Sequence, residues 1–183
     1  MQRRFVDHFV LSLGMVLGIL SSAPASTFKV LYTFGASGNS DAYLPEGTLI
    51  MDQAGNLYGT TVAGGPYNGG TVFELMKNAD GSWSEKILYS FTAGADGAQP
   101  LAAVVFDSEG NLYGTTSQGG INNSSCSQGC GVVFKLTPGS NQWTETVLHI
   151  FSGMPDGAGP GSALVIDPAG NLYGTTTYGG GGL

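Results

Sequence analysis

Three aspartates hold equivalent places in the chain, each four residues before a proline. These residues are Asp41, Asp96 and Asp156. Carboxylate oxygens suit Ca²⁺, so an ion held by a ring of these aspartates is one interpretation. Single carboxylates at this spacing lack the dense pattern of a calcium loop, and we favour the alternative that each aspartate shapes a turn. We therefore expect no bound cofactor.

Few other groups could do chemistry. Two carboxylates about 5 to 9.5 Å apart could hydrolyse a glycosidic bond, but Glu85 and Glu145 take equivalent positions at a strand edge, which favours a solvated face. His149 fills the position held by Tyr32 and Tyr89 in sister segments, so we expect a structural role for it. A zinc site or a Ser-His-Asp triad would depend on that one histidine, and both are poorly supported.

Cys126 and Cys130 lie in an insertion that lengthens one copy of a repeat. In an exported protein, two cysteines most simply form one disulfide that fixes their loop. The alternatives are a metal-binding pair and two free thiols. We expect the disulfide and no metal site.

The first 25 residues predict export. A basic start at Met1–Arg4 precedes an apolar run at Phe9–Leu20, and Ala23–Ala25 supplies the small residues of a cleavage site. The alternative is an uncleaved anchor, but the run is shorter than the roughly 20 residues that span a bilayer. We predict a signal peptide at residues 1–25 and a secreted mature chain without a transmembrane segment.

Composition excludes some partners. Charged residues make up 10% of the chain, where about 25% is usual, and the formal net charge is −7. The two arginines, Arg3 and Arg4, lie in the predicted signal peptide. The mature chain is therefore not expected to bind nucleic acid through phosphate neutralisation, or acidic glycans through an arginine clamp. Low charge with abundant glycine fits an all-β protein with many tight turns.

The heptapeptide GNLYGTT occurs at Gly55–Thr61, Gly110–Thr116 and Gly170–Thr176. Each copy lies in the longer pattern D-x-x-G-N-L-Y-G-T-T-x-x-G-G, and the start positions are 55 and 60 residues apart. The repeat region is predicted at residues 26–183, with copies at about 30–86, 87–146 and 147–183, the last truncated. We expect the second glycine, such as Gly59, to permit a close backbone approach.

Within one copy, four strand candidates alternate with turn signals. They are Leu101–Phe106, Asn111–Thr116, Gly131–Leu136 and Trp143–Phe151. A four-stranded antiparallel meander repeated at this period is typical of a β-propeller blade, whereas a β-sandwich would not need identical turns. We predict an all-β fold of propeller-like blades forming an incomplete propeller, with Val30–Phe34 as the fourth strand of a further blade.

The repeat pattern, continued by G-x-V-F-x-L and then L-Y-x-F-x-G-x-x-D-G-x-x-P, resembles the GloVer repeat over essentially all of Val30–Gly180. Choice-of-anchor tandem repeat GloVer-containing proteins are exported bacterial proteins with variable surface anchors and no established activity. Two departures are visible. No anchor segment follows the repeats, so surface anchoring is not carried over and we expect a fragment of a longer propeller. The first copy has Asp41-Ala42 where the others have Asp-Gly.

These features predict a non-catalytic exported module for extracellular binding or display. Its site would be the rim where the loops of Asp41, Asp96 and Asp156 lie beside the loops that follow the heptapeptide. Tyr67 and Tyr178 on the latter loops could stack on sugar rings, so a polysaccharide or a cell-surface protein is the expected partner. The alternative is an extracellular hydrolase or lyase that acts on polysaccharide at the channel mouth. Fold alone does not decide between them.

Overall fold

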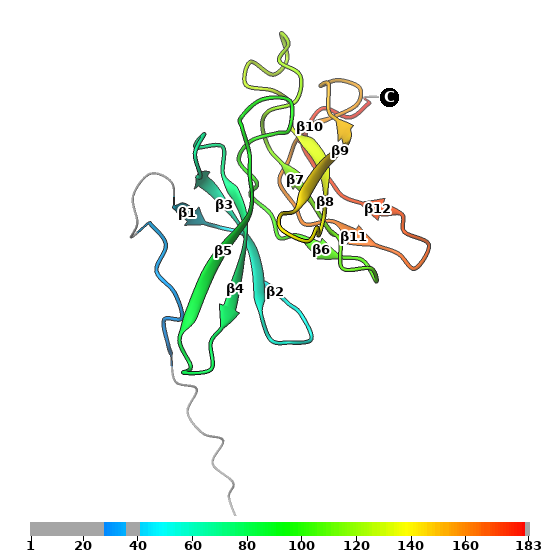
Figure 1. Ribbon diagram of the computed structural model, residues 1–183. Coiled ribbons are helices and arrows are strands. Elements are labelled where there is room, and N and C mark those ends of the chain that lie inside the picture. The colour runs from blue at the N-terminus through cyan, green and yellow to red at the C-terminus, as the bar shows by residue number, and fades with distance from the viewer. Residues whose placement is uncertain (1–27, 36–40, 182–183) are drawn as a thin grey trace, which may run out of the picture.

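The structure, a computed structural model, describes residues 28–35 and 41–181, and the predicted signal peptide lies outside these residues (Figure 1). The described residues form strands and connecting loops without a helix, which confirms the predicted all-β class. Consequently the described part of the chain offers no helix that is long and apolar enough to cross a membrane.

The first sheet contains a four-stranded antiparallel meander, which we call unit one. Its strands are β2 (Ile50–Met51), β3 (Leu57–Gly64), β4 (Thr71–Lys77) and β5 (Trp83–Ser90). An additional strand, β1 (Ala42–Pro45), pairs with the far end of β3. Each strand of the meander therefore pairs with the one that follows it in sequence.

A second sheet repeats this meander, and we call it unit two. Its strands are β6 (Val105–Phe106), β7 (Leu112–Thr116), β8 (Val132–Thr137) and β9 (Thr144–Ile150). The register is the same in both units, since the heptapeptide leucine faces a leucine of the third strand. The predicted four-strand order is confirmed, but the first strand is shorter than predicted because ladder pairing is confined to two residues.

Two short antiparallel pairs follow, and together we call them the half unit. They join β10 (Ala158–Pro160) to β13 (Thr176–Tyr178), and β11 (Val165–Ile166) to β12 (Leu172–Tyr173). The half unit lies beside unit two, orange to red in Figure 1, and β10 contacts β7. It corresponds to the first two strands of a unit.

The prediction of a strand at Val30–Phe34 is wrong, since these residues take part in no ladder. Their side chains nevertheless pack on unit one, where Tyr32 and Phe34 cover a cluster that contains Phe73. The Phe34 and Phe73 ring centroids lie 4.7 Å apart.

The heptapeptide is explained by one turn that occurs in all three copies. One oxygen of Asp52 accepts a hydrogen bond from the Asn56 backbone N–H at 2.9 Å. The other accepts from the Asn56 side-chain amide at 3.0 Å and from the Tyr58 hydroxyl at 3.2 Å. The glycine of each turn has a φ between 84° and 87°, which favours glycine. Asp107 and Asp167 accept the same contacts, so one aspartate shapes this turn in each of the three copies.

Neighbouring side chains of the heptapeptide pack in opposite directions, as the alternation of a strand requires. Leu57 packs within unit one against Phe73. Tyr58 packs toward unit two, where its ring centroid lies 5.0 Å from that of Phe106. One strand therefore contributes to two adjacent parts of the core.

The second glycine of the heptapeptide accommodates an aromatic ring. A Cβ atom at Gly59 would lie 2.6 Å from Cζ of Phe73, and one at Gly114 would lie 2.6 Å from Cζ of Phe134. Such contacts are too short for any side chain. The expectation of a close backbone approach is wrong, because the ring of the adjacent third strand fills this space.

Candidate functional site

The two sets of loops predicted to share a rim do meet in each repeat. The loop after the fourth strand pairs with the chain that continues past the heptapeptide. These pairs are Tyr43 with Ala63, Ala98 with Gln118, and Ala158 with Tyr178. The rim therefore has the same backbone construction three times, and differences between its side chains distinguish the repeats.

A hollow of about 580 Å³ opens on the rim of the first repeat. It is lined by polar and small residues and one aromatic side chain. These residues are Gly35, Asp41, Tyr43, Gly64, Gly65, Pro66 and Asn68. Tyr43 on β1 is 49% exposed, and Tyr67 on the loop between β3 and β4 is 62% exposed. Tyr178 is 71% exposed on the half unit, and no ring contact or hydrogen bond in the described residues joins it to Tyr67.

The rim aspartates Asp96 and Asp41 form hydrogen bonds with different residues. Asp96 accepts hydrogen bonds from the Tyr89 hydroxyl at 3.0 Å and from the Thr92 backbone N–H at 2.8 Å. Asp41 is hydrogen-bonded to Glu85. No group of three or more His, Cys, Asp and Glu side chains within residues 28–35 and 41–181 is arranged to hold a metal ion. The aspartates thus share a rim by topology without being gathered into one site.

A half-buried glutamate lies where the N-terminal segment meets unit one. Burial raises the pKa of Glu85 to about 7, and the hydrogen bond and negative charge of Asp41 act in the same direction. The Tyr32 hydroxyl donates to Glu85 at 3.0 Å. The prediction of a solvated face for Glu85 is wrong, because the N-terminal segment covers this strand.

An equivalent cluster lies between units one and two. Burial, followed by the negative charge of Asp96, raises the pKa of Glu145 to about 7. Tyr89 stands beside both carboxyl groups, and its pKa is raised by burial and by Asp96. The prediction of a solvated face is wrong here too. Sequence reasoning missed these clusters because their members come from different repeats, although the repeated Tyr, Asp and Glu positions were a usable signal.

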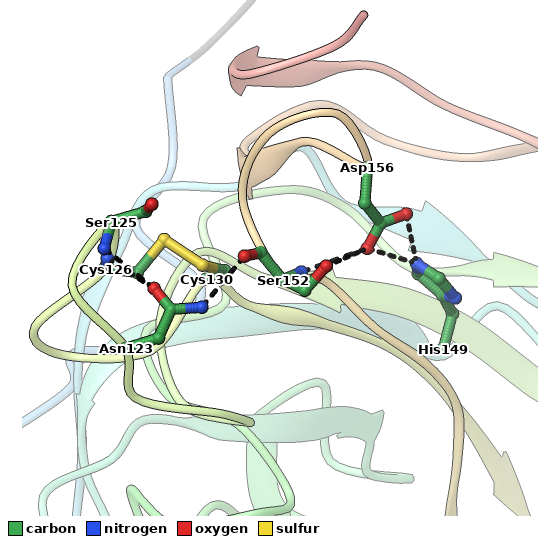
Figure 2. The surroundings of a disulfide bond; sticks show 7 residues. All are labelled: Asn123, Ser125, Cys126, Cys130, His149, Ser152 and Asp156. Carbon is green, nitrogen blue, oxygen red and sulfur yellow. Dashed lines mark hydrogen bonds and ion pairs between the residues drawn. A yellow bond between two sulfur atoms is a disulfide. The ribbon is translucent and has the colours of Figure 1, made fainter.

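His149 holds the position that Tyr32 and Tyr89 occupy in the other repeats, and Figure 2 shows its surroundings. Its Nε2 lies 3.0 Å from Oδ1 of Asp156, and the Ser152 hydroxyl donates to Oδ2 of Asp156 at 3.2 Å. Partial burial opposes ionisation of Asp156, but the Ser152 backbone bond and His149 outweigh it and lower the pKa. The aspartate lies between serine and histidine, whereas a nucleophilic triad needs the histidine between the other two. This arrangement holds a loop and does not activate Ser152.

The insertion of the second repeat packs on that same loop. Cys126 and Cys130 are joined by a disulfide, and the Asn123 side-chain amide donates to the Ser152 carbonyl oxygen at 2.8 Å (Figure 2). A Cβ atom at Gly153 would lie 3.0 Å from Cβ of Ser125. The disulfide loop therefore braces the rim of the half unit. Sequence reasoning did not single out Asn123, and no motif marked it.

Comparison with known proteins identifies the repeat of this chain. No match to the chain is found among curated proteins. The Gloeobacter/Verrucomicrobia repeat model matches residues 14–182, which include unit one, unit two and the described strands of the half unit. The chain therefore belongs to the Gloeobacter/Verrucomicrobia repeat family.

Proposed function

We propose that this chain is an exported, non-catalytic β-propeller module that binds extracellular polysaccharide through the rim of its loops. The observation that carries the proposal is the hollow on the rim of the first repeat, with exposed tyrosines beside it. Display of a cell-surface protein partner on the same rim is the related alternative.

The propeller part of the proposal rests on the two units. Each is a four-stranded antiparallel meander, and the two follow one another in sequence. Tyr58 of unit one packs on Phe106 of unit two, as expected for blades that stack face to face. Radial repetition of such sheets protects their faces and leaves short edges. Loops of one kind then gather on one rim around a channel.

The ligand class follows from the chemistry of the rim. Pockets for small ligands usually measure about 300 to 1,000 Å³, and the hollow falls in this range at about 580 Å³. Exposed tyrosine offers a flat apolar ring and a hydroxyl, which suits the C–H faces and hydroxyls of a sugar. The acidic chain has no arginine after residue 4, so uncharged sugars are favoured over acidic ones.

Export and a binding role are supported by two further features. A disulfide in a surface loop is typical of oxidising compartments outside the cytosol. The carboxylates of Asp96 and Asp156 are engaged by hydrogen bonds within their own loops. Such engagement favours a role in shaping the rim over a role in acid–base chemistry.

Titration against an array of uncharged polysaccharide fragments tests the proposal. We expect saturable binding that weakens about tenfold or more in Tyr67→Ala and Tyr43→Ala, a loss of at least about 1.4 kcal/mol. Tyr178→Ala reports whether the ligand spans the rim to the half unit. Met51→Ala is the control, because Met51 is 64% exposed on β2 away from the rim loops. Unchanged affinity in both rim variants would contradict the assignment of the site.

The second candidate is a polysaccharide hydrolase or lyase, and one observation favours it. A carboxyl with a pKa near 7 beside a second carboxylate is an arrangement that glycosidases use, and Glu85 and Glu145 are such carboxyls. The discriminating assay measures release of reducing ends from bound glycans. Intact glycans support the binding module, whereas release that Glu85→Gln or Glu145→Gln abolishes supports the enzyme.

A further inference from the structure

The half unit leaves one strand edge open. In the complete units, the strand carrying the heptapeptide pairs on one side with the preceding strand and on the other with the third strand. In the half unit, β12 and β13 pair with β11 and β10. Within the described residues no strand takes the position that β4 and β8 hold in the complete units.

Side chains beside this edge are less buried than their equivalents. Leu112 is 0% exposed and Thr116 is 0% exposed in unit two, whereas Leu172 and Thr176 are partly exposed. The phenylalanine that closes each fourth strand shows the same difference. Phe91 is fully buried, but the corresponding Phe151 is partly exposed.

The open edge also has space for a ring. A Cβ at Gly114 would meet the Phe134 ring, but a Cβ at Gly174 would meet one atom within 4 Å, Cδ2 of the flexible Leu164 side chain. A cleft of about 290 Å³ lies at this place, between unit two and the half unit. Phe151, Leu164 and Gly174 are among its lining residues.

The complete junction shows what fills such a space. The ring of Phe134 covers Gly114, and its centroid lies 5.1 Å from that of Phe91. The equivalent ring between the N-terminal segment and unit one is that of Phe73, which contacts Phe34. In both cases the ring belongs to a third strand with the pattern G-x-V-F-x-L.

We propose that the open edge of the half unit is a docking site for the third and fourth strands of a further repeat of this family. The register of unit two fixes the alignment, since Leu112 faces Leu136 and Gly114 faces Phe134. The docked strand runs antiparallel to β12 and β13 and places its leucine opposite Leu172 and its phenylalanine over Gly174. This proposal rests on the fold and does not depend on sugar binding.

The first test uses a synthetic peptide with the sequence of residues 70–91, which contains a complete third-and-fourth-strand hairpin and no cysteine. Fluorescence anisotropy of the labelled peptide is measured against the purified full-length chain. We expect saturable binding, with affinity reduced at least about tenfold when the peptide carries Phe73→Ala, since its ring is the part that fills the cleft. The peptide variant leaves the folding of the chain untouched.

Variants of the chain locate the site. Gly174→Val places a branched side chain where the ring would lie, so we expect it to weaken peptide binding at least about tenfold. Gly161→Ala is the control, because its Cβ would meet nothing closer than 3.7 Å. Circular dichroism of both variants checks that the chain remains folded.

A tethered version lowers the entropy cost of binding and avoids the marginal stability of an isolated hairpin. In this variant, a copy of residues 62–91 is attached directly after Thr176, just as these residues follow Thr61 in unit one. We expect the Tm to rise by several degrees, and the rise to vanish when the copied segment carries Phe73→Ala. Stabilisation of the tethered chain supports the proposal even where the free peptide binds too weakly to detect.

Three results would overturn the proposal. The first is failure of both the peptide and the tethered segment. The second is peptide binding of equal strength with and without the phenylalanine, or with Gly174→Val. The third is self-association of the chain that the peptide does not displace, which would assign the edge to a second copy. Whether the chain binds sugar does not affect the outcome of these experiments.

Discussion

The junction between units one and two and the junction between unit two and the half unit use the same residue types in different surroundings. Phe91 is fully buried against Phe134 at the first junction. Phe151 at the second is partly exposed. The difference shows that the phenylalanine of the third strand, rather than the heptapeptide, seals one repeat against the next.

The turn of the heptapeptide, by contrast, has the same hydrogen bonds in the half unit as in unit two. Asp167 in the half unit accepts hydrogen bonds from the Asn171 amide at 2.8 Å and from the Tyr173 hydroxyl at 3.0 Å. The corresponding bonds to Asp107 measure 2.7 and 3.0 Å. The turn is therefore encoded locally, whereas burial of the leucine and glycine beside it depends on a strand that comes later in the sequence.

The largest expected effect comes from removing the sealing ring. Phe134→Ala leaves a cavity beside Gly114 and Phe91, and we expect it to lower the free energy of unfolding by about 3 to 5 kcal/mol. Phe151→Ala should cost roughly 1 kcal/mol, because that side chain is partly exposed. Urea unfolding of both variants measures the difference. Similar losses would mean that the second junction is as well packed as the first.

The glycines sharpen the comparison. Gly114→Ala forces a Cβ to within 2.6 Å of the Phe134 ring, and we expect a loss of about 1 to 3 kcal/mol. Gly174→Ala meets the movable end of Leu164 instead, so we expect a loss below about 1 kcal/mol. The second substitution should become as costly as the first in the tethered chain. A Gly174 variant that remains harmless there would show that no ring lies over this glycine.

The glutamates predict a dependence on pH. The pKa values of Glu85 and Glu145 are about 7 in the folded chain, against an ordinary value of 4.5. The folded state therefore holds more protons than the unfolded state between these values, and stability falls as the pH rises through this window. We expect a loss of roughly 1 to 2 kcal/mol per group between pH 4.5 and pH 8, after allowance for solvent screening.

Thermal unfolding across this pH range measures the effect. The double variant Glu85→Gln with Glu145→Gln should lose most of the dependence of stability on pH, because neither amide titrates. Glu109→Gln is the matched control, since Glu109 is exposed in a turn. A slope that persists in the double variant would assign it to other groups.

The smallest expected effect tests the claim that the turn is local. Asp107→Ala and Asp167→Ala each remove several hydrogen bonds to the following residues, and we expect a local cost of about 1 kcal/mol in both. Amide exchange at Asn111 and Asn171 should quicken by about fivefold in the respective variants. A much larger change at Asn111 alone would show that the turn depends on its packing.

The local features could be predicted from the sequence, and the contacts between repeats could not. The all-β class, the four-strand order and the turn at Asp52 follow from repeated turn signals and alternation. Burial of Glu85 depends on a segment that lies far earlier in the chain, and spacing alone does not show this contact. The role of Gly59 was missed because the ring over it comes from another strand. Docking of Asn123 on Ser152 has no pattern to reveal it.

Amide hydrogen exchange of the full-length chain, followed by mass spectrometry, tests the central comparison most directly. Residues 112–116 and 172–176 have the same sequence and follow the same turn, but they differ in whether a third strand pairs with them. We predict at least about tenfold stronger protection of residues 112–116, and a gain of protection at 172–176 when the hairpin segment is tethered. Equal protection of the two segments in the chain alone would contradict the account.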